Sequence, residues 1–123
     1  MPNNIKKILV AEDEKAISKA LILKLSHAGF EATPAYDGES ALDLMAKEKF
    51  DLLLLDLMMP KLDGLNVLSQ MKIKGLTTPV IVTTNLGQEE DIKKAKELGA
   101  MDYFIKSDTA LAEIVDKIKK LSL

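Results

Sequence analysis

The chain has no cysteine, no tryptophan, one histidine and no apolar run near the ~20 residues of a membrane-spanning helix. Without cysteine there is no disulfide or thiolate metal site, and nothing points to an oxidising compartment. The 17 basic residues nearly balance the 19 acidic ones, and no basic block indicates a nucleic-acid surface. The amino-terminal stretch MPNNIKKILVAEDE lacks the apolar core of a signal peptide. We therefore expect a cytoplasmic protein with neither membrane nor nucleic acid as partner.

Apolar patterning is plentiful, and it predicts alternating strands and helices. Strand-like runs cover residues 8–11, 31–35, 52–55, 80–82 and 103–105, and helical stripes begin near residues 14, 42, 65, 92 and 111. Asp63-Gly64 is typical of a turn that begins a helix. No linker, repeat or low-complexity tract interrupts the 123 residues, so we expect one domain over 1–123. Such alternation predicts a doubly wound α/β fold, a parallel sheet with helices on both faces.

The residues that follow the strand-like runs carry the chemistry. In this architecture the ligand site lies beyond the carboxyl ends of the strands, where the strand order reverses. The residues at those ends are Glu12, Asp13, Asp56, Thr83, Thr84 and Lys106. Pro34 makes its strand an edge strand, which favours the order 2-1-3-4-5. That order brings three carboxylates, a hydroxyl and an ammonium to one edge of the sheet.

Asp56 needs a cation. It lies in LLLLDLMMPKLDG, directly after four leucines and before Leu57, Met58 and Met59, and a buried carboxylate without a partner is costly. Lys106 is one candidate partner. Hard oxygen ligands without histidine or cysteine suit Mg²⁺, which is the other. The six methionines, Met58 included, are interpreted as core filling.

These residues resemble the receiver domain of bacterial response regulators, the phosphoacceptor part of two-component signalling. The resemblance covers nearly the whole chain. Its motifs are the acid pair Glu12-Asp13, the stretch from Asp56 to Gly64 (DLMMPKLDG), a threonine at a strand end, and Lys106. Each motif alone is weak, but their order and separation are specific. The resemblance implies a flavodoxin-like (βα)5 fold.

The resemblance also implies a role for each residue. Asp56 would accept a phosphoryl group from a sensor histidine kinase, a phosphotransfer protein or a small phosphodonor. The implied Mg²⁺ ligands are Glu12, Asp13, Asp56 and the backbone carbonyl of Met58. Lys106 and Thr84 would contact the phosphoryl oxygens, and Thr84 with Tyr103 would form the switch. Such a domain is a phosphoacceptor switch that catalyses its own phosphorylation rather than an enzyme acting on other substrates.

The resemblance also implies the binding partners of the domain and the lifetime of its phosphorylated state. A downstream target would bind the face formed by the fourth helix, the fifth strand and the fifth helix, and the domain would be a monomer or a phosphorylation-dependent dimer. Met58 and Leu86 would flank the approach of a hydrolytic water, and neither can orient it, so autodephosphorylation is expected to be slow. Two positions depart from the family pattern: Ser107 stands where proline is usual, and Asn85 where alanine or glycine is usual.

Three other functions are conceivable for a chain of this pattern. A flavin domain of this topology would need a phosphate-cradling loop after the first strand, where Glu12 and Asp13 would repel phosphate. A haloacid-dehalogenase-type phosphatase would need a second aspartate at the position of Met58. A receiver-like interaction module that acts without phosphorylation stays open, although such a module would be expected to have lost an acid or the lysine.

Overall fold

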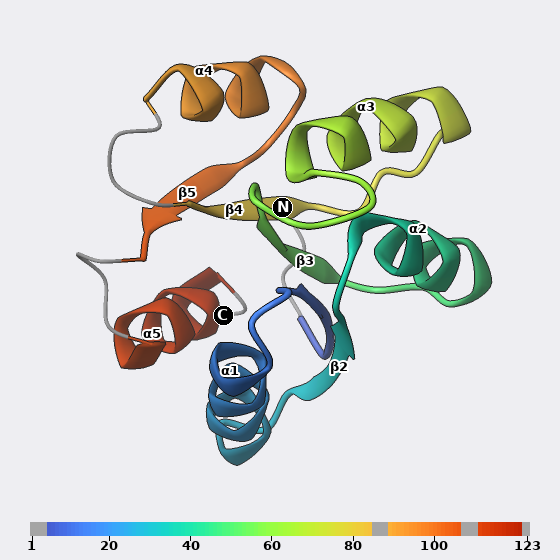
Figure 1. Cartoon of the computed structure of the whole chain (residues 1–123). Coiled ribbons are helices and arrows are strands. Elements are labelled where there is room, and N and C mark those ends of the chain that lie inside the picture. The colour runs from blue at the N-terminus through green and yellow to red at the C-terminus, as the bar shows by residue number, and fades with distance from the viewer. Residues whose placement is uncertain (1–4, 85–88, 107–110, 122–123) are drawn as a thin grey trace.

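The computed structural model describes residues 5–84, 89–106 and 111–121. In these residues strands and helices alternate (Figure 1). The strands are β1 Lys7–Ala11, β2 Glu31–Ala35, β3 Leu52–Asp56, β4 Val80–Thr84 and β5 Asp102–Ile105. The helices are α1 Lys15–His27, α2 Gly38–Lys47, α3 Gly64–Lys74, α4 Glu89–Glu97 and α5 Leu111–Leu121. Neighbouring strands are parallel and their order is β2-β1-β3-β4-β5, which confirms the predicted doubly wound, flavodoxin-like fold.

Helices cover both faces of the sheet, α1 and α5 on one face and α2, α3 and α4 on the other (Figure 1). The central strand β3 shows why the sequence runs LLLL there. Leu53 and Leu55 lie in the core under α2, α3 and α4, whereas Leu52 and Leu54 lie in the core under α1 and α5. Because each face meets a helix layer, the strand has no solvent side on which polar residues could alternate.

Two of the predicted strands, the third and the fourth, end too early, and the difference concerns the site. Strand β3 includes Asp56, and β4 continues to Thr84. Both residues are therefore held by the sheet itself. The predicted helix start at Asp63-Gly64 is confirmed, because the Asp63 carboxylate accepts a hydrogen bond from the N–H of Asn66 at 2.9 Å and so caps α3.

Strand β2 is an edge strand, as Pro34 predicts. Proline has no N–H to donate, and at the edge of the sheet only one neighbour, β1, makes a ladder with it. In the described ranges no helix is both long and apolar enough to cross a membrane.

Helix α1 carries a buried hydroxyl that leads to a stability prediction. The Oγ atom of Ser18 is buried, and among the described residues it has no hydrogen-bond partner. We expect Ser18→Ala to raise the free energy of unfolding by about 1 kcal/mol, because an unsatisfied buried polar group costs about 1–3 kcal/mol. Ser26→Ala, at an exposed position of the same helix, is the control for helix propensity. Urea denaturation of both variants measures the difference, and equal gains would contradict the prediction.

Candidate functional site

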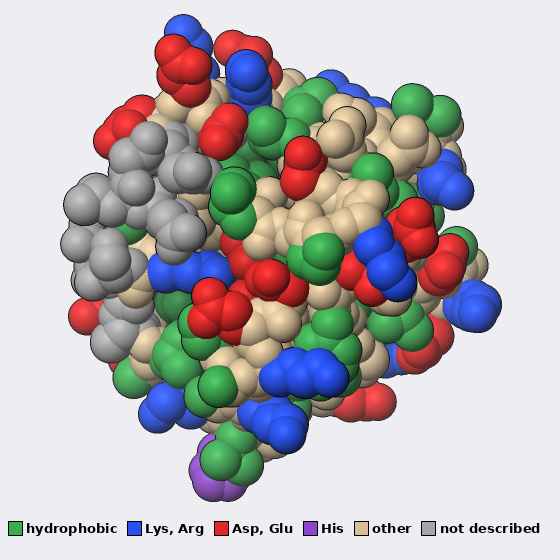
Figure 2. All heavy atoms as spheres, in the orientation of Figure 1, with side chains coloured by type: hydrophobic (Ala, Val, Ile, Leu, Met, Phe, Trp, Pro, Cys, Tyr) green, Lys and Arg blue, Asp and Glu red, His purple; other side chains and the backbone are tan. Residues whose placement is uncertain are grey.

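The carboxyl ends of β1, β3, β4 and β5 meet at one edge of the sheet. Ala11 pairs with Leu55, so the acids that follow β1 lie beside Asp56, and Asp56 itself pairs with Thr83 of β4. Carboxylate oxygens of Glu12, Asp13 and Asp56 all lie within 4.8 Å of one another. The structure thus brings together the three acids that the sequence singled out. In the view of Figure 2, acidic side chains gather near the middle of the face, with lysines beside them.

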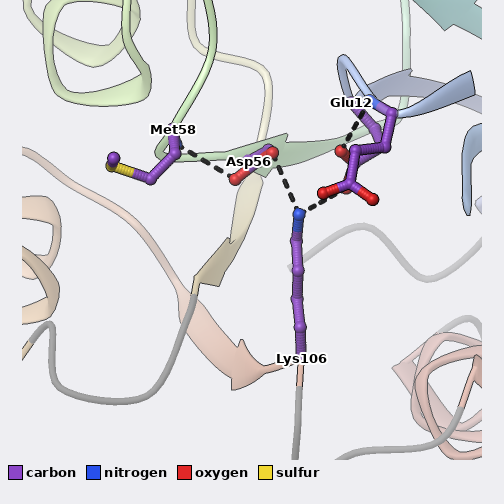
Figure 3. A network of polar contacts seen from close by, with 5 residues as sticks. Glu12, Asp56, Met58 and Lys106 are labelled. Carbon is purple, nitrogen blue, oxygen red and sulfur yellow. Dashed lines mark hydrogen bonds and ion pairs between the residues drawn. The ribbon is translucent and has the colours of Figure 1, made fainter.

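Lys106 reaches from the end of β5 into this acidic cluster (Figure 3). Its Nζ atom lies 2.7 Å from Oε1 of Glu12 and 3.0 Å from Oδ2 of Asp56. Burial lowers the pKa of Lys106, but the hydrogen bonds to Glu12 and Asp56 outweigh burial, and the pKa lies above its ordinary value. The ammonium is therefore charged at neutral pH and bridges two strand ends. The contact with Asp56 was predicted, whereas the ion pair with Glu12 was not.

Asp56 is almost fully buried, and its carboxylate accepts two hydrogen bonds. The backbone N–H of Met58 donates to Oδ1 at 3.0 Å, and Lys106 donates to Oδ2. Burial raises the pKa of Asp56, the Met58 N–H lowers it, the charge of Glu12 raises it and Lys106 lowers it, with a net result of about 7. The lysine alone does not offset the cost of burying this charge beside Glu12.

The donor set fits Mg²⁺. Three carboxylates converge, two of them buried and Asp13 half-buried, and the cluster contains neither histidine nor cysteine. Hard oxygen donors of this kind suit Mg²⁺, which binds through one or two carboxylates and keeps several waters. The pKa of Asp56 is raised chiefly by burial and further by the charge of Glu12, so a second cation at the cluster would stabilise the charged carboxylate. The side-chain orientation of Glu12 is fixed within the cluster, because its Oε2 atom accepts a hydrogen bond from the N–H of Glu14 at 3.1 Å.

The loop between β3 and α3 packs closely against its neighbours. Gly64 donates its N–H to the carbonyl of Leu57 at 3.0 Å, and a Cβ atom on Gly64 would lie 2.7 Å from the carbonyl oxygen of Asp56. A Cβ atom on Gly38, at the start of α2, would lie 2.1 Å from the carbonyl oxygen of Leu62. Glycine at these two positions therefore lets α2, α3 and the loop approach the end of β3.

Thr84 and Tyr103 lie on neighbouring strands. Thr84 is buried at the end of β4, and its carbonyl oxygen accepts the N–H of Lys106 at 2.8 Å. Tyr103 is half-buried on β5, and Nζ of Lys96 in α4 lies 5.0 Å from the centre of its ring. The switch role of Thr84 and Tyr103 stays a prediction.

Met58 does not fill the core, contrary to the prediction from the sequence. The core-filling interpretation is wrong because its side chain is 53% exposed, whereas Met59, the next residue, is buried. In the loop after β3 the Met58 side chain is therefore turned to solvent and the Met59 side chain into the core. Asn85, Leu86 and Ser107 lie outside the described residues, so the predictions that involve them stay predictions.

Comparison with known proteins is consistent across sequence and structure. The family model of the response regulator receiver domain matches residues 8–119. The transcriptional regulatory protein DltR of Streptococcus agalactiae is 38% identical over 120 residues, which are 95% of this chain and 54% of that protein. The alkaline phosphatase synthesis transcriptional regulatory protein PhoP of Bacillus subtilis is 43% identical over 101 residues, 82% of this chain and 42% of that protein.

Solved structures agree with these relatives. The receiver domain of the Francisella response regulator 1452 superposes with a TM-score of 0.85 at 33% identity, covering 95% of this chain and 96% of the other. A LuxR-family DNA-binding response regulator from Staphylococcus aureus gives 0.87 at 26% identity, covering 97% and 100%. The chain spans about half the length of the curated relatives. It belongs to the receiver-domain family of two-component response regulators.

Proposed function

We propose that Asp56 accepts a phosphoryl group from the phosphohistidine of a sensor histidine kinase or phosphotransfer protein, or from a small phosphodonor. The observation that carries the proposal is a buried carboxylate held between a lysine and two further acids at the carboxyl edge of the sheet. An Asp56 oxygen attacks phosphorus, and the bond from phosphorus to the donor breaks with its electron pair leaving on the donor. The product is an acyl phosphate on Asp56.

The residues around Asp56 suit this step. Phosphoryl transfer asks the protein mainly to position the groups and to neutralise charge on the equatorial oxygens. The ammonium of Lys106 lies 3.0 Å from the Asp56 carboxylate and would pair with a phosphoryl oxygen after transfer. We assign to Thr84 a hydrogen bond to the same group, because it ends the strand next to β3.

The proposal includes Mg²⁺ as the resident metal. Glu12, Asp13, Asp56 and the backbone carbonyl of Met58 would hold it, and when bound it supplies positive charge to the phosphoryl oxygens. Lys106 forms ion pairs with both Glu12 and Asp56. Its charge reduces the repulsion between the two carboxylates and holds them at the same end of the sheet. The whole chain, 1–123, would act as one phosphoacceptor domain and switch, as a monomer or as a phosphorylation-dependent dimer.

Mg²⁺ affinity tests the ligand assignment. We expect Asp13→Asn to weaken Mg²⁺ binding by about tenfold or more, because one unit charge near a divalent ion contributes several kcal/mol even at an effective dielectric constant of 20. Asp43→Asn, which removes an exposed carboxylate from α2, is the matched control. NMR titration with MgCl2 measures both affinities. Equal affinity in the wild type and Asp13→Asn would remove Asp13 from the ligand set.

The partner-binding face is assigned to α4, β5 and α5. Ala95 is the buried residue of α4 in a helix that is otherwise rich in charge, so the helix is weakly anchored and its rearrangement costs little. Phosphorylation would act on this face through Thr84, on the strand β4 that packs against α4, and through Tyr103 of β5, whose ring contacts Lys96 of α4. A downstream protein would distinguish the two states there.

Hydrogen exchange checks this assignment. On phosphorylation we expect amide exchange to change most over residues 89–99, because α4 is held by so few buried side chains. Helix α1, with three buried residues, is the internal reference. Exchange changes confined to α1 and α2 would contradict the assignment.

Phosphorylation itself is tested by intact mass spectrometry after incubation with acetyl phosphate and Mg²⁺. We expect one phosphoryl adduct on the wild type and none on Asp56→Asn. Asp51→Asn changes the aspartate before β3, whose carboxylate accepts the N–H groups of Lys6 and Lys7, and should leave the adduct intact. No adduct on the folded wild type would favour the second candidate, a receiver-like module that binds partners without phosphorylation.

A further inference from the structure

A pocket of about 320 Å³ lies between α1 and α5, beside the carboxyl edge of the sheet. The two helices lie side by side on the same face of the sheet (Figure 1). Their side chains make the apolar wall of the pocket, which consists of Ile17, Leu21, Leu111 and Ile114. Polar residues from the sheet edge line the rest. Small-molecule sites in proteins have this character, because they are concave and mostly apolar with a few convergent polar groups.

Thr83 is the lining residue that points to a ligand. It is 5% exposed, and within the described part of the chain its hydroxyl has no hydrogen-bond partner. Side chains alternate along a strand, and Ile81, two residues earlier on β4, packs in the core under α1 and α5. The Thr83 side chain therefore lies on the face of the sheet that carries the pocket. A hydroxyl at this depth is most stable when it is hydrogen-bonded, and a molecule in the pocket can supply the partner.

The charges at the same end of the pocket favour a neutral head group. The Lys106 ammonium has three N–H donors, and its contacts with Glu12 and Asp56 use two of them (Figure 3). A ligand carboxylate would be repelled by these two acids. A ligand ammonium would lie against the Lys106 ammonium, while both Glu12 oxygens already accept hydrogen bonds, from Lys106 and from the N–H of Glu14. A neutral hydroxyl avoids both repulsions and can accept a hydrogen bond from Lys106.

We propose that this pocket binds a small apolar molecule that carries one neutral hydroxyl, such as an alkylphenol, and that its occupation slows phosphorylation of Asp56. The hydroxyl bonds to Thr83 and Lys106, and the apolar body lies between α1 and α5. An engineered cavity of about 150 Å³ binds benzene, so a pocket of about 320 Å³ accommodates one ring with a short substituent. The effect on phosphorylation rests on the proposed function, whereas the binding does not.

The effect on phosphorylation has a specific cause. The third N–H of Lys106 is the donor that remains for a phosphoryl oxygen, and a bound hydroxyl competes for it. We expect a saturating ligand to slow adduct formation by about fivefold, which corresponds to the net contribution of one hydrogen bond.

Methyl NMR titration with 4-ethylphenol at pH 7 tests the site. This phenol is neutral at pH 7, because phenolic hydroxyls have a pKa of about 10. We expect the methyl signals of the four wall residues to shift, and those of Leu53 and Leu55, in the core on the other face of the sheet, to stay unchanged. No saturable shift at the wall residues, or larger shifts on the other face, would overturn the proposal.

Charged analogues test the head group. We expect 4-ethylbenzoate and 4-ethylbenzylamine to bind at least about tenfold more weakly than 4-ethylphenol, because each brings a charge against a like charge near the sheet edge. Equal or tighter binding of either analogue would overturn the assignment of a neutral head group.

Two variants locate the ligand. Thr83→Val keeps the shape of the side chain and removes the hydroxyl, so we expect 4-ethylphenol to bind about fivefold more weakly. Thr77→Val, at an exposed threonine before β4, is the matched control and should leave the affinity unchanged. Ile17→Phe places a ring in the pocket from a half-buried position on α1 and should abolish binding. Wild-type affinity in both Thr83→Val and Ile17→Phe would overturn the proposal.

The effect on phosphorylation is measured separately. Wild type and Ile17→Phe are incubated with acetyl phosphate and Mg²⁺, each with and without saturating 4-ethylphenol, and adduct formation is followed by intact mass spectrometry. We expect the phenol to slow the wild type and to leave Ile17→Phe unchanged. An unchanged rate in the wild type, or equal slowing of both proteins, overturns the effect on phosphorylation. Failure of the wild type to form any adduct without the phenol would instead refute the proposed function, while the titration result would stand alone.

Discussion

Asp56→Asn is expected to make the metal-free domain more stable than the wild type at pH 8, by about 2–4 kcal/mol. The cause is the raised pKa of Asp56, about 7, which reflects burial and the neighbouring charge of Glu12. The difference between that value and an ordinary aspartate corresponds to about 4 kcal/mol. Asparagine keeps the shape of the side chain and removes the charge. The carboxylate thus costs stability in the metal-free domain, and a cation bound beside it would restore part of that stability.

The sign of the pH dependence follows from the raised pKa. Protons bind Asp56 more tightly in the folded state, so its favourable contribution is fully present below about pH 4 and is lost as pH rises through about 7. Urea denaturation in EDTA at pH 5 and pH 8 measures it. Asp37 and Asp51, whose pKa values are lowered chiefly by backbone N–H groups of Ser40 and Lys7, are common to both proteins and cancel in the comparison. A stability difference independent of pH would contradict the prediction.

Gly38→Ala is expected to destabilise the domain by about 3 kcal/mol, near the upper end of overpacking costs. The added Cβ atom would lie 2.1 Å from the carbonyl oxygen of Leu62 and 2.8 Å from a methyl group of Val67. The nearest contact is backbone, so no side-chain rotation relieves it. Either the first turn of α2 or the loop before α3 must move, and that loop also holds the end of β3.

Glu39→Ala is the matched control for Gly38→Ala. Glu39 is exposed and adjacent on the first turn of α2, so its replacement should change the free energy of unfolding by less than about 0.5 kcal/mol. Thermal or urea denaturation compares the two variants. Equal stability of Gly38→Ala and Glu39→Ala would contradict the prediction, because it would mean that the loop moves away from the added Cβ atom without loss of stability.

The fold was predictable because each element has its own signal in the sequence. Four leucines on β3 predict a strand covered on both faces, and Pro34 predicts the edge strand β2. The ends of β3 and β4 were less predictable. Apolar residues stop before Asp56 and Thr83, whereas the backbone ladder continues through these polar residues because neighbouring strands pair with them.

The site was predictable as a set of residues but not as a set of contacts. Strand order brings Glu12, Asp13, Asp56 and Lys106 to one edge, so a correct prediction of the order also identifies these residues. It cannot decide that Lys106 bridges Glu12 as well as Asp56, because this depends on side-chain reach across two strands. The outward direction of Met58 also needed the structure, since neighbouring methionines carry the same apolar signal.

The position of the phosphoryl group tests the phosphoacceptor role of Asp56 most directly. After incubation with acetyl phosphate and Mg²⁺, borohydride reduces an aspartyl phosphate to homoserine, which marks the residue permanently. Trypsin cleavage after Lys49 and Lys61 releases one peptide that contains two aspartates, Asp51 and Asp56, as an internal comparison. We expect homoserine at position 56 and unmodified aspartate at position 51. Homoserine at any other position, with Asp56 unmodified, would contradict it.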